Sequence, residues 1–408
     1  MSETQKHTKP NVPNLRFPGF SGEWERIRVS DLLEFFSTNS LSWEQLEYGG
    51  TEILNLHYGL IHNGLPTQIN IEESILPSVR TEFKPRKYML CKDGDVAFAD
   101  ASEDTNDVGK VVEFMKCADR EIVCGLHTIH GRDKLGKTIP GFKGYAFSSS
   151  AFHKQLRRIA QGTKIFSINT GNFEETFIGI PNKGEQKKIA SLLSIIDQRI
   201  AIQNRIIEDL KRLKTAICEV SYNEAKENKR LSQFIFQLSI RNKNNQVTNV
   251  LSVSNRLGFV AQSEQFEDRK VASEDTTNYK IVEYNDFAYN PARINVGSIA
   301  RMSSQEQGII SPMYTCFRAH QNVLPEFLEF FFSTKRFDLE MKKRLEGSVR
   351  QCLSFEGLGD IQFPMVEIEA QRKVILKVRA IVEKINIESR ILDLLIVQKR
   401  QILNMMFI

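Results

Sequence analysis

The most regular hydrophobic pattern in the chain lies between residues 185 and 221, where apolar side chains recur every three or four positions. This spacing places them along one stripe of an α-helix, and the segment contains no Pro or Gly. Asn182 stands where an N-cap would, and Glu185 three positions later completes a capping-box pattern. If the whole segment is helical, its roughly 37 residues form a rod on the order of 55 Å long.

The same pattern returns at the end of the chain with a constant shift, so that Gln186 corresponds to Gln371 and Ile196 to Ile381. A shift this long indicates two copies of a large unit, since the repeats of a solenoid span about 20 to 50 residues. A single helix that exposes an apolar stripe to water is not stable, so we expect the two helices to pack as an antiparallel pair. The residues predicted for this packing and for subunit contacts are Ile189, Leu193, Ile196, Ile200, Ile206, Leu210, Ile217, Ile381, Ile385, Ile391, Leu395 and Ile402.

The stretches between the helical runs show short β-type runs separated by turn residues. In the first stretch the expected elements are strands within 52–61, 88–91, 96–99, 110–114 and 121–129, and a closing helix over 149–159. In the second stretch, residues 279–290 match residues 88–99, which aligns Asp286 with Asp95, and a helix is expected over 326–344. Gly162 and Gly347 are related by the same shift as the two long helices.

These patterns predict an α+β fold, in which two pseudo-twofold-related globular lobes with mainly antiparallel sheets are joined by two long antiparallel coiled-coil helices. The predicted parts are a flexible N-terminal tail (1–22), a first lobe (23–182), a central helix (183–222), a second lobe (223–366) and a C-terminal helix (367–408). The loops differ between the lobes: residues 241–249 and 290–308 have no convincing counterpart in the first lobe, and residues 131–144 have none in the second. A duplicated scaffold with divergent loops is expected of a protein that recognises two different targets.

Composition narrows the class of protein only modestly. The chain has 408 residues and a formal net charge of +5, which permits nucleic-acid binding without requiring it. No apolar run approaches the roughly 20 residues that span a bilayer, and the first residues do not resemble a secretory signal. The six cysteines form no CxxC pair and no zinc-ligand spacing. We therefore expect a cytoplasmic protein with reduced thiols, no bound metal and no membrane partner.

The chain resembles the specificity subunit of type I restriction-modification systems. The resemblance covers nearly the whole sequence and is carried by the entry PNLRFPGF-x3-W (13–24), the lobe ending IPNKGEQKKIASLLSIIDQRI (180–200) and the second ending FPMVEIEAQRKVILKVRAIVEKI (363–385). The second ending has Ala370 before Gln371, where the family pattern usually has Glu.

The resemblance implies a subunit that binds double-stranded DNA and has no catalytic activity of its own. Each lobe would be a target recognition domain that reads one half of a bipartite, asymmetric sequence, and the helix pair would set the unread spacer. Two modification subunits would dock on the helices and methylate adenine N6 with S-adenosylmethionine, and restriction subunits would cleave DNA with ATP and magnesium. This chain would bind none of these cofactors. The alternative is a coiled-coil scaffold protein that binds no DNA.

Under this interpretation the candidate DNA contacts are Arg, Lys and Asn side chains in turn-rich segments, because these groups read guanine and adenine edges best. In the first lobe they are Arg80, Lys84, Arg86, Asn106, Lys110, Arg132, Lys134 and Lys137. In the second lobe they are Arg241, Asn242, Lys243, Asn244, Arg256, Arg293, Asn295, Arg301 and Arg350. The alternative for each is an ordinary surface residue, and most true contacts should touch phosphates and not bases.

Two motifs of enzymes occur in the first lobe without the context that such chemistry needs. Residues 131–138, GRDKLGKT, fit the P-loop pattern, but Pro140 and Gly141 disfavour the required helix after Thr138. His127 and His130 have an HxxH spacing within a β-like run, which would place them on opposite faces of a strand. We therefore expect a core or loop role for both histidines.

The apolar surface of the long helices is wider than one seam. Ile202, Ile207, Ile387 and Leu392 flank the stripe, whereas a two-helix pair needs only a narrow seam. The excess predicts that helices of partner subunits pack there, unless the lobes themselves cover these residues.

Overall fold

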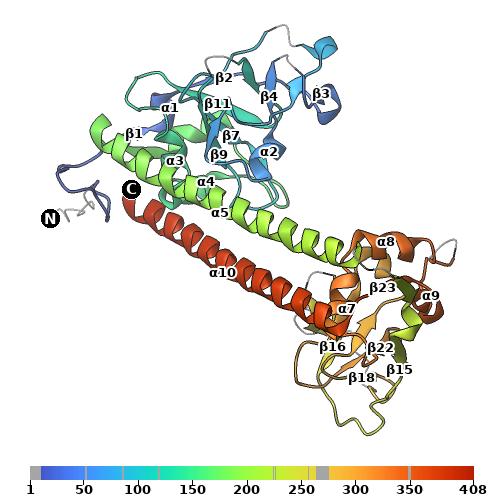
Figure 1. Cartoon of the computed structure of the whole chain (residues 1–408). Helices are drawn as coiled ribbons and strands as arrows, with labels where there is room; N and C mark the ends of the chain where they lie inside the picture. The colour runs from blue at the N-terminus through green and yellow to red at the C-terminus, as the bar shows by residue number, and fades with distance from the viewer. Residues whose placement is uncertain are drawn as a thin grey trace. The chain divides into compact units, whose positions relative to one another are not determined.

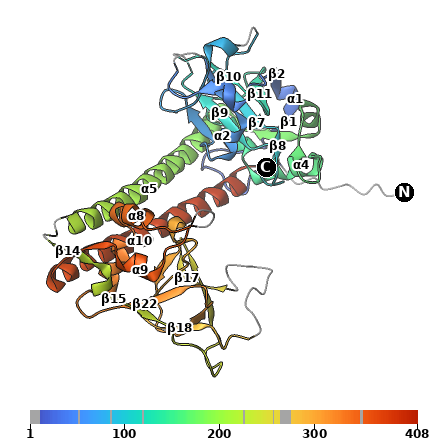
Figure 2. The ribbon, with the colours of Figure 1, turned by 90° about the vertical axis from the view of Figure 1, so that its right-hand side faces the viewer.

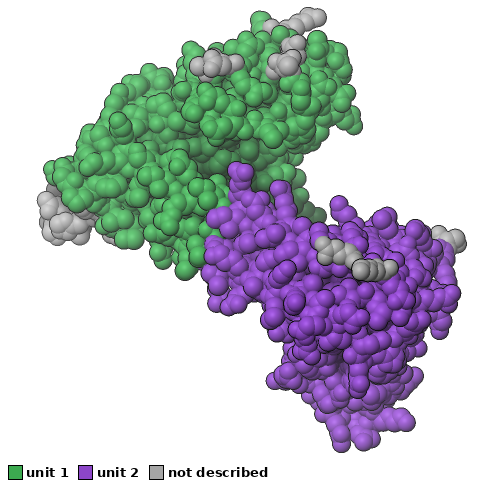
Figure 3. All heavy atoms as spheres, in the orientation of Figure 1, with its two compact units in different colours: residues 1–204, 391–408 green, residues 205–390 purple. Residues whose placement is uncertain are grey.

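The computed structural model describes residues 11–50, 53–84, 87–117, 120–223, 225, 227–255, 257–262, 275–347 and 351–408. The chain divides into two compact units, residues 1–204 with 391–408 and residues 205–390 (Figure 3). Each unit contains one lobe and part of each long helix, α5 (Lys183–Asn223) and α10 (Ile368–Met406) (Figure 1). The predicted α+β fold with two lobes and two long helices is confirmed, although the boundaries of the compact units lie inside the helices.

Asn182 caps the start of α5, as the sequence predicts, whereas the Glu185 side chain binds Arg16. The Asn182 side chain accepts a hydrogen bond from the Glu185 backbone N–H at 3.0 Å, as expected of an N-cap. The Glu185 carboxylate accepts two hydrogen bonds from the Arg16 guanidinium, at 2.7 and 2.8 Å. Residues 1–10 of the predicted tail lie outside the described residues. In the described part of this segment, Arg16 binds Glu185 of α5 and the Leu15 N–H donates to the Met405 carbonyl of α10.

Within the first unit the two helices run antiparallel, as predicted. Ile189 and Leu193 of α5 share a core with Met406 of α10, and further along α5 Asp197 forms an ion pair with Lys399 at 2.6 Å. In the second unit the C-terminal end of α5 and the start of α10 contribute to another core, through Cys218, Tyr222, Ile375 and Val378. Each lobe therefore packs on both helices.

The buried seam differs from the prediction near the middle of both helices. Ile206 and Ile391 are 37% and 38% exposed, whereas Gln203, Ile207 and Glu388 are buried. A strict alternation of three- and four-residue steps along α5 leads from Ile196 through Ile200 to Gln203 and Ile207, so Ile206 falls beside the seam. The sequence pattern was misleading here because a polar residue occupies a seam position.

The first lobe is built on a five-stranded and a four-stranded sheet (Figure 2). In spatial order the larger sheet contains β2 (Leu33–Phe36), β11 (Thr128–Asp133), β7 (Val96–Ala99), β9 (Val111–Met115) and β5 (Gln68–Asn70). The smaller sheet contains β10 (Ile122–Cys124), β4 (Leu54–Leu56), β6 (Ser78–Val79) and β3 (Leu46–Glu47). Two short pairs complete the lobe, β1 (Glu25–Arg28) with β13 (Phe177–Ile180) and β8 (Ala101–Ser102) with β12 (Phe166–Ser167).

Short helices cover these sheets: α1 (Val29–Leu32), α2 (Tyr58–His62), α3 (Lys143–Phe147) and α4 (Ser150–Ile159). The predicted closing helix is α4, and Ser149 caps it by accepting from the Phe152 N–H. The run 52–61, expected as one strand, is instead β4 followed by α2, because the His57 side chain caps a helix there.

The second lobe has the same arrangement with two four-stranded sheets. One contains β15 (Ile235–Leu238), β22 (Thr315–Ala319), β19 (Phe287–Tyr289) and β20 (Ile299–Arg301). The other contains β17 (Gly258–Ala261), β16 (Val250–Ser254), β21 (Gly308–Ile310) and β18 (Lys280–Val282). The lobe also has the pair β14 (Glu227–Arg230) with β23 (Gln362–Met365), and the helices α7 (Pro325–Phe331), α8 (Lys335–Lys342) and α9 (Phe355–Gly359).

The sheets are mainly antiparallel, as predicted, with parallel pairing of β4 with β10, β5 with β9 and β16 with β21. The helix expected over 326–344 is divided into α7 and α8. Thr334 causes the break, because its hydroxyl caps α8 by accepting from the Phe337 N–H.

Strand register defines which positions correspond in the two lobes. His130 of β11 lies opposite Ala97 of β7, and Cys316 of β22 lies opposite Ala288 of β19. His130 therefore corresponds to Cys316, and Ala97 corresponds to Ala288. The second correspondence has the same shift that the sequence predicts for Asp95 and Asp286.

Two glycines confirm the shift that relates the long helices. Gly162 and Gly347 have φ angles of 135° and 102°, in the region that favours glycine. Each follows a residue that forms an isolated antiparallel bridge, Gln161 with Ser167 and Glu346 with Cys352. The closing segments of the two lobes are therefore copies of one structure.

Candidate nucleic-acid interface

The candidate residue Arg132 is engaged within the first lobe. Its guanidinium donates to both carboxylate oxygens of Asp95, at 2.8 and 2.7 Å, and to the Leu90 carbonyl at 2.9 Å. The His130 Nε2 atom lies 2.8 Å from the same carboxylate. Burial alone would raise the pKa of Asp95, but the hydrogen bonds from His130 and Arg132 lower it below its ordinary value. Arg132 is thus a structural partner of a buried carboxylate.

The second lobe repeats this ion pair at the corresponding positions. Arg318 donates through Nε to one carboxylate oxygen of Asp286 and through Nη2 to the other, at 2.5 and 3.1 Å. The hydrogen bonds to Asp286 raise the pKa of Arg318. The sequence pattern aligned the two aspartates but did not identify Arg318. Residue spacing could have identified it, because Arg132 and Arg318 are separated in the sequence by the same number of residues as His130 and Cys316.

Two candidates in the second lobe are buried. Arg301, 9% exposed, donates to Glu329 at 2.9 Å and to Asn285 at 2.9 Å. Asn242, 2% exposed, donates to the Val247 carbonyl at 2.8 Å. The structure thus contradicts their assignment as surface contacts, because both polar groups are bound inside the lobe.

The loop after β11 uses its basic residues locally and does not form a P-loop. Lys134 donates to the Ser30 carbonyl at 3.0 Å, and Lys137 pairs with Glu25. The Thr138 hydroxyl donates to Asp133 at 2.6 Å, and the next helix, α3, begins only at Lys143. The helix N-terminus that a phosphate site needs directly after the threonine is absent from this described segment.

Two other candidates of the first lobe lie near α2 and α4. Lys110 approaches the His62 carbonyl at 3.4 Å. Asn106 is exposed, accepts from Arg157 at 2.9 Å and donates to Asp104 at 2.9 Å. The candidates Arg86, Arg256 and Arg350 lie outside the described residues.

The remaining candidates of the first lobe, the half-buried Arg80 and the exposed Lys84, lie on one edge, which we call edge 1 and define as residues 37–47 and 80–84. The first of these segments directly follows β2. The two segments are joined by a hydrogen bond from the Arg80 N–H to the Gln45 carbonyl at 3.1 Å, and the Arg80 Nε reaches the Leu46 carbonyl at 3.4 Å. Lys84 and Trp43 are exposed on this edge.

The second lobe has a corresponding edge 2, defined as residues 239–247 and 275–280. Its first segment directly follows β15, as edge 1 follows β2. The Asn242 N–H donates to the Tyr279 carbonyl at 3.0 Å, and Arg241 donates to the Asn278 side chain at 2.8 Å. The exposed candidates on edge 2 are Arg241, Lys243 and Asn244.

Arg293 and Asn295 belong to a different place in the second lobe. Both are exposed at the short 3₁₀ helix Ile294–Val296. Gly297, which ends this helix, lies beside Asn255 at the end of β16. Edge 2 precedes β16, so these two candidates are near the opposite end of that strand.

Both long helices expose large apolar side chains beyond their seam. On α5 these include Ile195, Ile202, Ile206, Leu213 and Val220, which are 37% to 59% exposed. On α10 they include Leu376, Ile387, Ile391, Leu394 and Ile396, which are 38% to 69% exposed. Ile202 and Ile387, predicted to widen the apolar surface, are therefore exposed, whereas Ile207 is buried and belongs to the seam. Among the described residues, no helix is long and apolar enough to cross a membrane.

Comparison with known proteins finds similarity to one kind of protein. Residues 22–212 match the family model described as type I restriction modification DNA specificity domain. The S subunit of a type I restriction-modification system from M. genitalium is 16% identical, with 97% of this chain and 99% of that chain covered at a TM-score of 0.54. A chain from a structure that describes complex assembly and conformational transition of the type I R-M system is 14% identical, with 93% and 96% covered at a TM-score of 0.56. These likenesses to solved structures show the fold, and no curated protein matches the sequence significantly.

Proposed function

Because residues 22–212 belong to the type I restriction modification DNA specificity domain family, we propose that the chain is the DNA-reading subunit of a type I restriction-modification complex. Each lobe reads one half of a bipartite double-stranded DNA target. The chain itself has no catalytic role, and the complex acts in the cytoplasm.

The observation that carries this proposal is the duplication of the internal frame. The family model covers only the first lobe and part of α5. Strand register, the Asp95–Arg132 and Asp286–Arg318 ion pairs and the two glycine turns extend the same domain type to the second lobe. Two copies of one DNA-specificity domain in one chain support the reading of two half-sites.

Edges 1 and 2 are the surfaces that we propose for reading DNA. Edge 1 directly follows β2 and edge 2 directly follows the corresponding strand β15, yet their residues differ. Edge 1 carries Arg80, Lys84 and the exposed Trp43, whereas edge 2 carries Arg241, Lys243 and Asn244. Arg and Lys suit phosphates and guanine, and Asn suits adenine, so equivalent edges with different side chains support different half-sites.

The exposed apolar residues of α5 and α10 support a docking role for the helices. We propose that two modification subunits pack there and methylate adenine N6, and that restriction subunits join the same complex. S-adenosylmethionine, ATP and magnesium would be bound by those subunits. The length of the helix pair would set the unread spacer between the half-sites.

Single-molecule methylation sequencing tests the proposal with the full chain expressed beside its cognate modification subunit. The expected result is one split motif with an unread gap and N6-methyladenine in both halves. A complex that forms but leaves no modified motif, and that shows no salt-dependent DNA affinity, would overturn the DNA-reading function and favour a scaffold protein.

A further inference from the structure

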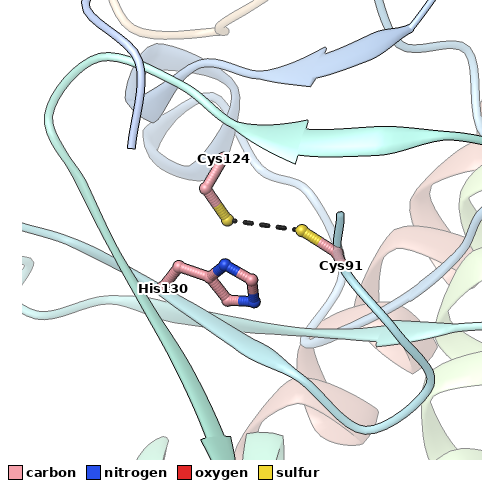
Figure 4. Close-up of side chains that lie close together, drawn as sticks. All are labelled: Cys91, Cys124 and His130. Carbon is pink, nitrogen blue, oxygen red and sulfur yellow. Dashed lines mark hydrogen bonds between the residues drawn. The ribbon is translucent and has the colours of Figure 1, made fainter. Parts of the chain in front are cut away.

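Three potential metal ligands meet in the interior of the first lobe: Cys91, Cys124 of β10 and His130 of β11. Their ligand atoms all lie within 4.8 Å of one another, and the three residues are buried. The two Sγ atoms are 3.6 Å apart. Figure 4 shows both thiols pointing toward the same side of the imidazole ring.

The sulfur separation fits a shared metal ion. Two thiolates on one tetrahedral zinc, each at about 2.3 Å, would be about 3.8 Å apart. Two packed thiols would also fit a separation of 3.6 Å, so this distance alone does not distinguish a metal site from two thiols in contact. The imidazole beside them is the feature that simple thiol packing does not require.

The orientation of His130 matches that of a metal-binding histidine. Its Nε2 atom lies 2.8 Å from the Asp95 carboxylate, and Arg132 and the Lys92 N–H hold that carboxylate in place. Histidines that bind metals usually donate their second ring N–H to a carboxylate, which fixes the ring and increases its basicity. With Nε2 used in this way, Nδ1 is left to bind a metal.

In the second lobe, the three equivalent positions carry residues that do not form such a group of ligands. Register equates Cys91 with Val282 and Cys124 with Ile310, because the Leu90↔Val123 bridge corresponds to the pair Ile281↔Ile309. His130 corresponds to Cys316. Val282, Ile310 and Cys316 are fully buried in one apolar cluster. The fold therefore does not need two thiols and an imidazole at these positions.

We propose that Cys91, Cys124 and His130 form a metal site in the first lobe that binds a zinc ion. Two thiolates and one imidazole are ligands that zinc prefers, and two thiolates neutralise its charge inside the lobe. A small fourth ligand can complete the tetrahedron. The ion would tie the strand β10 to β11 and to the segment of Cys91, and so stabilise the lobe. The three ligands are adjacent only in the fold, so the cysteine spacing in the sequence gives no sign of such a site.

Metal analysis of the full chain tests the site. The reduced protein is loaded with Zn²⁺, desalted and measured by mass spectrometry of its metal content, with Co²⁺ loading as a spectroscopic readout of thiolate ligation. We expect about one zinc ion per chain. The variant Cys91→Val/Cys124→Ile gives the first lobe the residues of the second, so it should fold and bind no zinc. Cys316→Ser, which removes a buried thiol from the second lobe, should retain the ion.

The variants also define what would overturn the site. A reduced wild-type chain that binds no zinc at a several-fold excess of Zn²⁺ excludes it. Zinc that remains bound to the folded Cys91→Val/Cys124→Ile variant assigns the ion to other residues. His130→Gln distinguishes the histidine: it should weaken zinc binding at least tenfold and alter the Co²⁺ spectrum, and unchanged binding would remove His130 from the site.

Discussion

Gln186 and Gln371 make the same set of hydrogen bonds at the start of α5 and α10. The Gln186 side-chain oxygen accepts from the Ile139 N–H at 3.0 Å, and the Gln371 side-chain oxygen accepts from the Leu324 N–H at 2.8 Å. Ile139 lies in the loop before α3, and Leu324 lies in the loop before α7. Each side-chain nitrogen donates to a carbonyl of the same loop and to the carbonyl of the residue that directly follows the preceding strand, Pro181 after β13 or Val366 after β23. All these partners are related by the same shift as the two glutamines. One buried amide thus joins each long helix to its lobe.

Removing this amide should destabilise one lobe. Gln186→Ala leaves one N–H and two carbonyl groups without their partner, and we expect a loss of about 3 kcal/mol in the free energy of unfolding. Both tryptophans, Trp24 and Trp43, belong to the first lobe, so urea denaturation followed by tryptophan fluorescence measures the effect. Gln198→Ala, an exposed position on the same helix, is the control and should change the midpoint little. Equal effects of both variants would show that the amide has no special role.

Glu113 makes the stability of the first lobe depend on pH. Its carboxylate accepts from the Gly141 and Gly144 N–H groups at 2.9 and 2.8 Å. Burial raises its pKa from 4.5 to about 7, against the opposing effect of Lys143. A carboxyl whose pKa is raised on folding binds more protons in the folded state, so stability decreases as pH rises from about 4.5 to 7.

The variant Glu113→Gln removes this titration. Relative to the variant, the wild-type chain should lose roughly 3 kcal/mol between pH 5 and pH 8. Urea midpoints by tryptophan fluorescence at several pH values measure the difference. Glu121→Gln, at an exposed position, should leave the pH dependence unchanged. Parallel pH curves for wild type and Glu113→Gln would contradict the raised pKa.

The elements that repeat were predictable because their signals are local and occur twice. The apolar stripe, the Asn182 cap and the shift between the two helices are read directly from the chain. The failures arose where contacts between distant residues decide the structure. Glu113 corresponds by register to Arg301, since Val96 opposes Glu113 and Phe287 opposes Arg301. One lobe binds the carboxylate with backbone N–H groups, and the other binds the guanidinium with glutamates, so an alignment of residue types hides the equivalence.

The same limit applies to the candidate DNA contacts. Charge and turn context identified Arg132 and Arg301 together with Arg241 and Lys243, but only pairing distinguishes an arginine that binds a buried carboxylate from one on an exposed edge. Residues 131–144, expected to lack a counterpart, correspond to a slightly shorter segment of the second lobe, as the partners Ile139 and Leu324 show. That difference in length was enough to conceal the match in the sequence.

Substitutions on edge 2 should change one half of the target. If Arg241 or Asn244 contacts a base, its replacement by alanine costs about 1 to 3 kcal/mol of discrimination at that position. If Lys243 contacts a phosphate, Lys243→Ala weakens binding to all sequences and lowers the slope of log affinity against log salt by about 1. Methylation sequencing and binding titrations at several salt concentrations separate these effects.

Lys342→Ala on α8, an exposed position away from edge 2, is the matched control for charge removal. It should leave the motif and the salt slope unchanged. A change in both halves of the motif after a substitution on edge 2 would contradict modular reading.

The length of α5 and α10 should determine the unread spacer. Insertion of one heptad into each helix, after Asn204 and after Arg390, at the boundaries of the compact units, keeps the three- and four-residue seam in register. Seven residues lengthen each helix by about 10 Å, which equals about three base pairs at about 3.4 Å per pair. Methylation sequencing should therefore report both half-sites unchanged, because the lobes are untouched, and a gap longer by about three base pairs. An unchanged gap in an active complex would show that the helices do not measure the spacer, and altered half-sites would show that the lobes do not read independently of the helices.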